Sequence, residues 1–236
     1  MARRLIIQNR GRGGPTYTSP SHRFFGKLAY PAVKEKTYGE IVDIVNSVGH
    51  SAPLMIVEMA NGQMFLTPAP LGVRVGQKIE LGNAEVAVGN IMRLGDIATG
   101  TIVSNIESRP GDRGKFLRAG GAGAQVIGKE GKTVSIRLPS KQKKVLNSNC
   151  LATVGIVAGA GRCNKPLMKA GNAHHKRKAK NKLFPIVKGV AMNVCDHKHG
   201  GTHRRNLGMS TSIKRGTPPG AKHGALSPKR MGRKKR

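Results

Sequence analysis

The sequence contains no tryptophan, and aromatic residues make up only 3% of its 236 positions. Acidic residues are also scarce: 11 Asp and Glu face 42 Lys and Arg, which gives a formal net charge of +31. Because so few acids cannot neutralise the cations internally, a polyanionic partner is expected, and nucleic acid is the commonest one. The scarcity of aromatic rings argues against a sequence-tolerant single-strand binder and favours recognition of folded RNA by shape and backbone.

Long apolar runs and paired cysteines are missing as well. No apolar stretch approaches the ~20 residues of a transmembrane helix. The apolar stretch near the N-terminus, LII, is too short for a signal peptide. Three widely spaced cysteines do not make a disulfide framework. Binding to an anionic membrane surface needs an amphipathic helix with large apolar residues, which the basic tail lacks. We therefore expect an intracellular protein that does not bind membranes.

The charge is distributed unevenly along the chain. Residues 1–40 carry +6, residues 41–110 carry −2, residues 111–160 carry +7 and residues 161–236 carry +20. The near-neutral segment suits a domain with its own core. In the last segment the apolar residues are isolated, and their burial cannot offset an ordering cost of ~1–2 kcal/mol per residue. From about residue 170 we therefore expect a largely irregular extension, disordered when free or held by its partner.

Short β-branched runs separated by turn residues begin after an N-terminal stretch rich in Arg, Gly and Pro. The runs APLMIVEM and QMFLTPA flank Asn61 and Gly62, and Asn-Gly between two such runs predicts a β-hairpin. VGQKIELG adds a further strand. About five strands at this spacing predict a small barrel of the oligonucleotide/oligosaccharide-binding (OB) type.

A second β-rich block follows residue 101. In TVSIRL, residues 133–138, apolar side chains alternate with polar ones, which predicts a strand with one buried and one cationic face. A second small barrel is the natural interpretation. The fold class is thus mainly β, with an extended N-terminal arm, two small barrels and a long basic C-terminal extension. The predicted boundaries are 1–37 for the arm, 38–96 and 97–168 for the barrels, and 169–236 for the extension.

The glycine-rich stretch RAGGAGAQVIGKEGK matches neither GxxxxGK[ST] nor a GxGxxG between a strand and a helix. We interpret it as a segment that passes close to another backbone. Direct contact with RNA phosphate through its backbone N–H groups stays open.

The stretch GVAMNVCDHKHGGTHRRN gathers one carboxylate, three histidines and one cysteine. Cys195, His197 and His199 alternate, so in a strand they would share one side, and Cys163 or Asp196 would complete a zinc site; however, no CxxC pair is present. Asp196 beside His197 suggests general acid/base catalysis. An irregular loop against phosphate is the interpretation we favour over both.

The same stretch carries a resemblance to a known family. GVAMNVCDHKHGG is similar to the GVAMNPVDHPHGG signature of the L-two family of large-subunit ribosomal proteins, with Val194 and Lys198 in place of two prolines. PGDRGKFLRAGGAGAQVIGKEGKTVSIRLPS and CLATVGIVAGAG resemble that family's second barrel. KPLMKAGNAHHKRKAKNKLFPIVKGVAMN resembles its archaeal and eukaryotic branch, and the chain length suits an archaeal member. The resemblance covers residues 39–236.

The resemblance implies an OB-like barrel, then an SH3-like barrel, with extensions that penetrate ribosomal RNA (rRNA). It implies a cytoplasmic, non-enzymatic constituent of the large ribosomal subunit that supports subunit association, tRNA binding and the peptidyl-transferase region. The expected partners are large-subunit rRNA, neighbouring ribosomal proteins, small-subunit rRNA at the subunit interface and, indirectly, tRNA. No cofactor is expected beyond structural Mg²⁺ at the rRNA interface. The alternative is direct general acid/base participation of His197, with Asp196, in peptide bond formation.

Cations neutralise phosphates and release counterions, so the basic residues are the main candidates for rRNA binding. Together with neighbouring polar residues they are Arg3, Arg4, Arg10, Arg12, Arg23, Arg113, Lys115, Arg118, Lys165, Lys169, His174, His175, Lys176, Arg177, Lys178, Lys180, Lys182, Lys188, Asn193, His197, Lys198, His199, Arg204, Arg205, Lys214, Arg215, Lys229 and Arg230.

Overall fold

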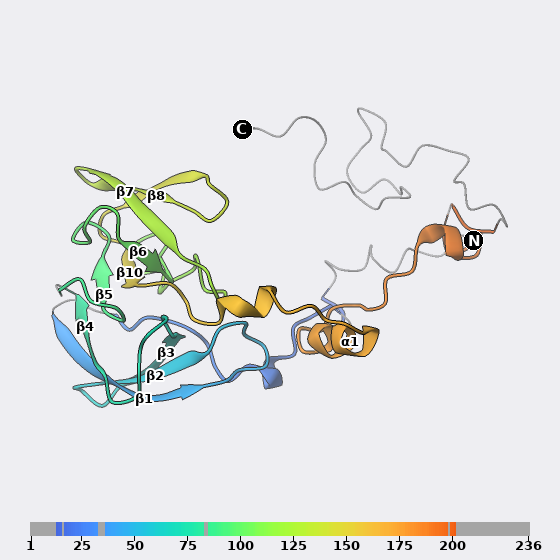
Figure 1. Ribbon diagram of the computed structural model, residues 1–236, viewed down its shortest axis with the longest axis horizontal. Coiled ribbons are helices and arrows are strands. Elements are labelled where there is room, and N and C mark those ends of the chain that lie inside the picture. Colours follow the sequence, from blue (N-terminus) through green and yellow to red (C-terminus); the bar gives the residue numbers. More distant parts are fainter. Residues whose placement is uncertain (1–12, 16, 33–35, 83–84, 198, 202–236) are drawn as a thin grey trace. The chain divides into compact units, whose positions relative to one another are not determined.

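A computed structural model describes residues 13–15, 17–32, 36–82, 85–197 and 199–201 (Figure 1). The chain divides into two compact units, residues 21–168 (the β unit) and residues 1–20 with 169–236 (the terminal unit). The described elements are η2 (Ser21–Arg23), β1 (Thr37–Val45), β2 (Leu54–Met59), β3 (Met64–Pro68), β4 (Lys78–Gly82), β5 (Ile91–Arg93), β6 (Ile102–Ser104), β7 (Ala124–Glu130), β8 (Thr133–Arg137), β9 (Lys143–Asn147), β10 (Leu151–Val154), η3 (Ala160–Cys163), α1 (Ala170–Lys178) and η4 (Gly189–Ala191).

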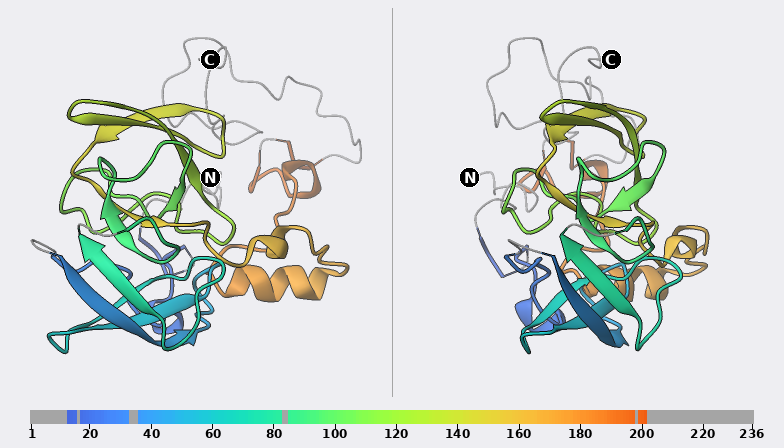
Figure 2. Two further views of the ribbon diagram at one scale, coloured as in Figure 1. Left: turned by 60° about the vertical axis from the view of Figure 1, so that its left-hand side comes forward. Right: turned by 90° about the vertical axis from the view of Figure 1, so that its left-hand side faces the viewer.

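The ten strands form one continuous, strongly bent sheet in the order β3-β2-β1-β4-β5-β10-β6-β7-β8-β9. The strand pairs are antiparallel except for β4 and β5, which run parallel over two residue pairs. Figures 1 and 2 show β1–β3 at one end of the β unit and β7–β8 at the other, with β5, β6 and β10 between them. The mainly β class is confirmed, and the arrangement is consistent with two successive barrels.

The first core forms under β1–β5. The hairpin predicted at Asn61 and Gly62 is present: β2 pairs antiparallel with β3, and Gly62 takes a φ of +76° in the turn. A positive φ is the reason for glycine there. Ten buried side chains, among them Ile41, Val57 and Ile79, make the cluster. This core therefore draws on every strand of the first block.

The second core lies under β5–β10. The alternation predicted for residues 133–138 is confirmed, since Val134 and Ile136 are fully buried whereas Thr133 and Arg137 are exposed. Strand β8 pairs with β7 on one side and with β9 on the other. One face of this strand therefore packs inward, and its cationic face points to solvent.

Strand β10 connects the two cores. It pairs antiparallel with both β5 and β6. Leu151, at its start, packs against the first cluster, whereas Ala152 and Val154 belong to the second. The boundary between the cores therefore follows alternating side chains of one strand, rather than a linker in the sequence.

Part of the segment predicted as an N-terminal arm packs into the β unit. Leu28 and Tyr30 are buried, and Tyr30 belongs to the first core. Its hydroxyl contacts the Thr153 hydroxyl at 2.5 Å and donates to the carbonyl of Asn105 at 2.7 Å. Burial raises the pKa of Tyr30 well above its usual value of 10. Residues 21–32 thus belong to the β unit, although their composition resembles an arm.

The glycine-rich stretch passes close to other backbone, as predicted. A Cβ on Gly120 would lie 2.6 Å from the carbonyl oxygen of Ser51 and 3.0 Å from that of Gly159. A Cβ on Gly121, whose φ is +77°, would lie 2.7 Å from Cα of Ala160. Real Cβ atoms do not tolerate such distances. These glycines therefore serve close packing within the β unit.

The terminal unit departs from the irregular structure expected from residue 170 onward, because Ala170–Lys178 form the helix α1. Its alanine, lysine and arginine residues have high helix propensity, which a search for apolar periodicity overlooks. Among the described helices, none is long and apolar enough to cross a membrane.

Candidate nucleic-acid interface

Helix α1 presents cations without contributing to any core. None of its nine residues is buried, and its first turn contains no acid. Its last turn carries His175, Lys176, Arg177 and Lys178. Cations at a helix C-terminus interact favourably with the helix dipole. A helix that is polar all round nevertheless gains little from burial, so its polar surface is available to a partner.

Local contacts hold the chain that follows α1. The guanidinium of Arg177 lies 4.9 Å from the ring centre of Phe184, which is cation–π geometry. The side-chain amide of Asn181 donates to the backbone carbonyl of Thr18 at 2.8 Å and also to that of Pro15. Pro15 and Thr18 are thereby tied to the segment that follows the helix.

A second group of predicted residues lies in the loop between β6 and β7. The carboxylate of Glu107 is buried and accepts backbone N–H bonds from Arg113 at 2.7 Å, Leu151 at 2.9 Å and Gly111 at 3.3 Å. Arg113 adopts a φ of +61° and its side chain is exposed. The buried carboxylate therefore shapes the loop that displays this arginine.

Two cationic side chains of the same loop form hydrogen bonds or an ion pair within the protein. Arg118 is half-buried and donates to the carbonyls of Gly114 at 3.1 Å and Leu28 at 2.5 Å. Burial lowers the pKa of its guanidinium. Lys115 forms an ion pair with Asp112, with 2.5 Å between Nζ and Oδ1, and this lowers the pKa of that carboxyl. Arg118 thus braces the loop, whereas Lys115 stays largely exposed.

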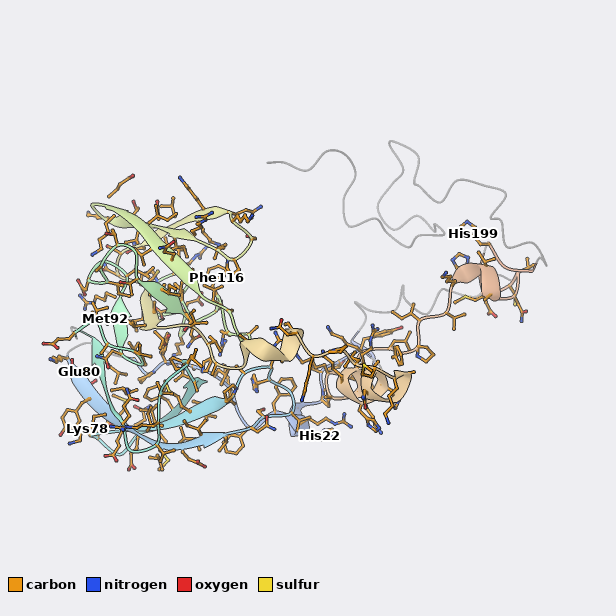
Figure 3. The ribbon with its side chains drawn as sticks, viewed as in Figure 1. His22, Lys78, Glu80, Met92, Phe116 and His199 are labelled. Carbon is orange, nitrogen blue, oxygen red and sulfur yellow. The ribbon has the colours of Figure 1, made fainter. Side chains whose placement is uncertain are left out.

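The histidine-rich loop closes on itself. The backbone N–H of Gly201 donates to the carbonyl of Met192 at 3.0 Å, and that of His197 donates to Asn193 at 3.1 Å. The rings of His197 and His199 are buried, with their centres 5.1 Å apart. Figure 3 labels His199 in this loop. The two imidazoles, predicted to contact phosphate, are thus packed inside the loop.

The backbone N–H of His199 donates to Nδ1 of His197 at 3.0 Å. In a nucleophilic triad, the Nδ1–H group of the histidine donates a hydrogen bond to the carboxylate. Here, Nδ1 of His197 accepts a hydrogen bond instead. The arrangement in which Asp196 orients His197 through Nδ1 is therefore not formed.

The zinc hypothesis placed Cys163, Cys195, His197 and His199 around one ion. Across the described part of the chain, no three His, Cys, Asp or Glu side chains are placed to hold a metal. Cys163 and Cys195 are exposed, whereas both imidazoles are buried.

The remaining predicted residues fall into two groups. Lys165, Lys169, Lys182, Lys188 and Asn193 are exposed, and Arg23 and Lys180 are half-buried. Outside the described residues lie Arg3, Arg4, Arg10, Arg12, Lys198, Arg204, Arg205, Lys214, Arg215, Lys229 and Arg230.

Sequence reasoning missed several cations on β8, β9 and the turn between them. Arg137, Lys141 and Lys143 are exposed and line one hollow. Nζ of Lys144 lies 4.0 Å above the ring centre of Phe116, which Figure 3 labels. The run KQKK was the available signal, together with the outward position of Arg137 in the alternating strand.

Comparison with known proteins gives a consistent result. The family described as "Ribosomal Proteins L2, C-terminal domain" matches residues 87–220. The chain is 47% identical to "Large ribosomal subunit protein uL2" of Methanococcus vannielii over 241 residues, covering 99% of this chain and all of the relative. It is also 44% identical to the protein of that name from Saccharolobus islandicus over 235 residues, covering 99% of both. A third relative with this name, from Methanococcus maripaludis, is 47% identical over 99% of this chain.

Proposed function

The chain belongs to the L2 family of large-subunit ribosomal proteins, and on that premise we propose that it binds large-subunit rRNA directly through the cations of α1 and of the loop around Arg113. As a member it is a structural constituent of the large ribosomal subunit rather than an enzyme. Its relatives with the printed name uL2 include archaeal proteins.

The observation that carries the proposal is the exposed helix α1. Four cationic or imidazole side chains occupy its last turn, and it buries none of its residues. An isolated nine-residue helix is marginal in water, and its crowded positive charges repel one another. RNA phosphates on either side of such a helix remove that repulsion and release counterions.

Phosphate contacts provide affinity, and the shape of the β unit determines which site on the folded RNA is recognised. The carboxylate of Glu107 holds the loop that carries Arg113 by three backbone hydrogen bonds. The side chain of Arg113 therefore approaches RNA from a preorganised loop, so the loop loses little conformational entropy on binding.

We extend the proposal to subunit association, tRNA binding and support of the peptidyl-transferase region, through contacts with neighbouring ribosomal proteins and small-subunit rRNA. The loop between Gly189 and Gly201, which backbone hydrogen bonds close, supports it as an element that could insert between RNA helices. Structural Mg²⁺ at this interface would be held chiefly by RNA oxygens, because the described residues offer no cluster of three acidic, imidazole or thiol groups.

General acid/base catalysis by His197 is the rival proposal. The acceptor role of Nδ1 argues against it, because a triad-like Asp196–His197 pair needs a proton on that nitrogen. Burial of the ring argues in the same direction, since a general base must reach its substrate directly or through one water.

Salt-dependent binding of the full-length protein to purified large-subunit rRNA tests the proposal. Replacing Lys176 and Lys178 with glutamine should weaken binding and reduce the slope of log K against log salt by about 1 per lost phosphate contact. The matched control is Lys27→Gln with Lys78→Gln, which removes two exposed lysines of the β unit. An unchanged slope in the α1 variant would overturn the role of the helix.

A further inference from the structure

An open hollow of about 580 Å³ lies on the outer face of the second core, where β7, β8 and β9 run side by side. Arg137, Lys141 and Lys143 line it, and none of its lining residues is acidic. The remaining lining residues are Thr99, Gly100, Gln125, Val126 and Ile127. None of the residues that line the hollow belongs to α1 or to the loop around Arg113.

The strand register places like charges directly opposite each other. Arg137 on β8 pairs with Lys143 on β9, and Gln125 on β7 pairs with Arg137 on its other side. The next pair toward the turn is hydrogen-bonded, since the Leu138 N–H donates to the Gln142 carbonyl at 3.0 Å. Successive residue pairs of two antiparallel strands alternate between hydrogen-bonded and non-hydrogen-bonded pairs, so Arg137 and Lys143 form a non-hydrogen-bonded pair. The side chains of such a pair lie closer together than those of a hydrogen-bonded pair.

Directly opposed like charges destabilise a sheet, and a third cation increases the repulsion. Lys141 sits in the turn with a φ of +65°, and its N–H donates to the Leu138 carbonyl at 2.8 Å. This left-handed backbone conformation is uncommon outside glycine. The ion pairs found among the described residues do not include any of the three cations. The arrangement is thus unfavourable for the free protein and favourable once an anion lies between the side chains.

We infer that this hollow holds backbone phosphates of RNA. The inference rests on the proposed rRNA binding and adds a further contact surface, on the part of the β unit that contains the second core. The arginine supplies a planar, bidentate donor for a phosphate, and the two lysines supply mobile point charges. The hollow lies on the sheet face that side-chain alternation directs outward, so a duplex backbone reaches it without unfolding the strand.

The test uses the full-length chain with Arg137→Gln and Lys143→Gln together. The matched control is Lys129→Gln with Lys132→Gln, which removes two exposed cations near the β7–β8 turn, outside the hollow. Against purified large-subunit rRNA, the hollow variant should bind at least tenfold more weakly than the control at 0.2 M salt. At low salt without RNA, its Tm should rise by about 2 °C through relief of repulsion, whereas that of the control should not.

Lysine acetylation footprinting separates the possible ligands. Lys143 should be protected in the rRNA complex and should remain reactive with inorganic pyrophosphate alone. Equal protection by pyrophosphate would assign the hollow to free anions and overturn the inference. Equal loss of rRNA affinity in the two variants would show that only net charge matters, and would also overturn it. If the wild-type chain does not bind rRNA at all, the proposed function itself fails, which is a different result from either.

Discussion

The buried ring of His197 accepts, at Nδ1, the backbone N–H of His199 two residues further along the chain. That bond leaves any ring proton of the neutral imidazole on Nε2. The side chain consequently acts as a structural acceptor within its own loop, much as an Asn or Asp side chain does in a turn.

Replacing His197 with asparagine should keep the loop closed, because the asparagine carbonyl oxygen can accept the same N–H, whereas alanine should open it. In assembled large subunits we expect both variants to form peptide bonds in single-turnover assays at rates within a few-fold of wild type. A fall of about 10²–10⁴ in both variants, the usual contribution of general acid–base catalysis, with normal subunit assembly would contradict the structural role.

Gly189 is required by the same ring, since a Cβ on it would overlap the imidazole of His197. Gly189→Ala should therefore disrupt the loop, with faster hydrogen exchange of the amides of Gly200 and Gly201. The control is Gly171→Ala in α1, where a Cβ meets nothing within 4 Å. Alanine there should stabilise the helix by about 0.5–1 kcal/mol. Unchanged exchange in the first variant would show that the loop tolerates the extra methyl group.

Because Tyr30 is buried, we expect the stability of the fold to depend on pH. Burial, the largest cause, raises its pKa above the ordinary value of 10.0. Above about pH 10 the unfolded chain loses the phenolic proton while the folded chain keeps it, so the free energy of unfolding falls as pH rises. Tyr30→Phe should lower stability by about 1–3 kcal/mol at neutral pH, because buried partners of the hydroxyl lose their bonds. Urea denaturation from pH 8 to 11 should then show a steeper decline in wild type than in the variant.

The cysteines should differ in reactivity. Burial raises the pKa of the Cys150 thiol, whereas Cys163 and Cys195 are exposed. Because the thiolate is the reactive form, a disulfide reagent at pH 8 should modify two thiols rapidly and the third only after unfolding in guanidinium. Mass spectrometry of peptides identifies the slow thiol. Rapid labelling of Cys150 in the native protein would contradict its place in the second core.

Elements with a strong local pattern were predictable from the sequence. The Asn61–Gly62 hairpin and the alternation around Val134 depend on neighbours in the chain, and both are present. Tyr30 was not predictable in this way: its burial depends on Asn105 and Thr153, which lie 75 and 123 positions away. The Arg, Gly and Pro residues around it have the composition of a solvated arm.

The candidate interface was predictable only in outline. Net charge identified the basic C-terminal third and its cations, but charge does not distinguish a displayed cation from one used internally. Arg118 was predicted as a phosphate ligand, and in the structure it donates to two backbone carbonyls. Burial of His197 likewise follows from how the loop closes, which residue spacing does not reveal.

The position of β10 between β5 and β6 has a consequence for biosynthesis. A ribosome makes this chain from its N-terminus, and Leu151–Val154 form the last strand among the residues that the structure describes. Until these residues emerge from the ribosome, β5 and β6 each present an unpaired edge. Both cores then also lack the side chains that β10 contributes. Exposed edges and apolar surface promote aggregation of nascent chains. The β unit is therefore most vulnerable in the interval before residue 154 is available, and it can complete its fold only after nearly two thirds of the chain has been synthesised.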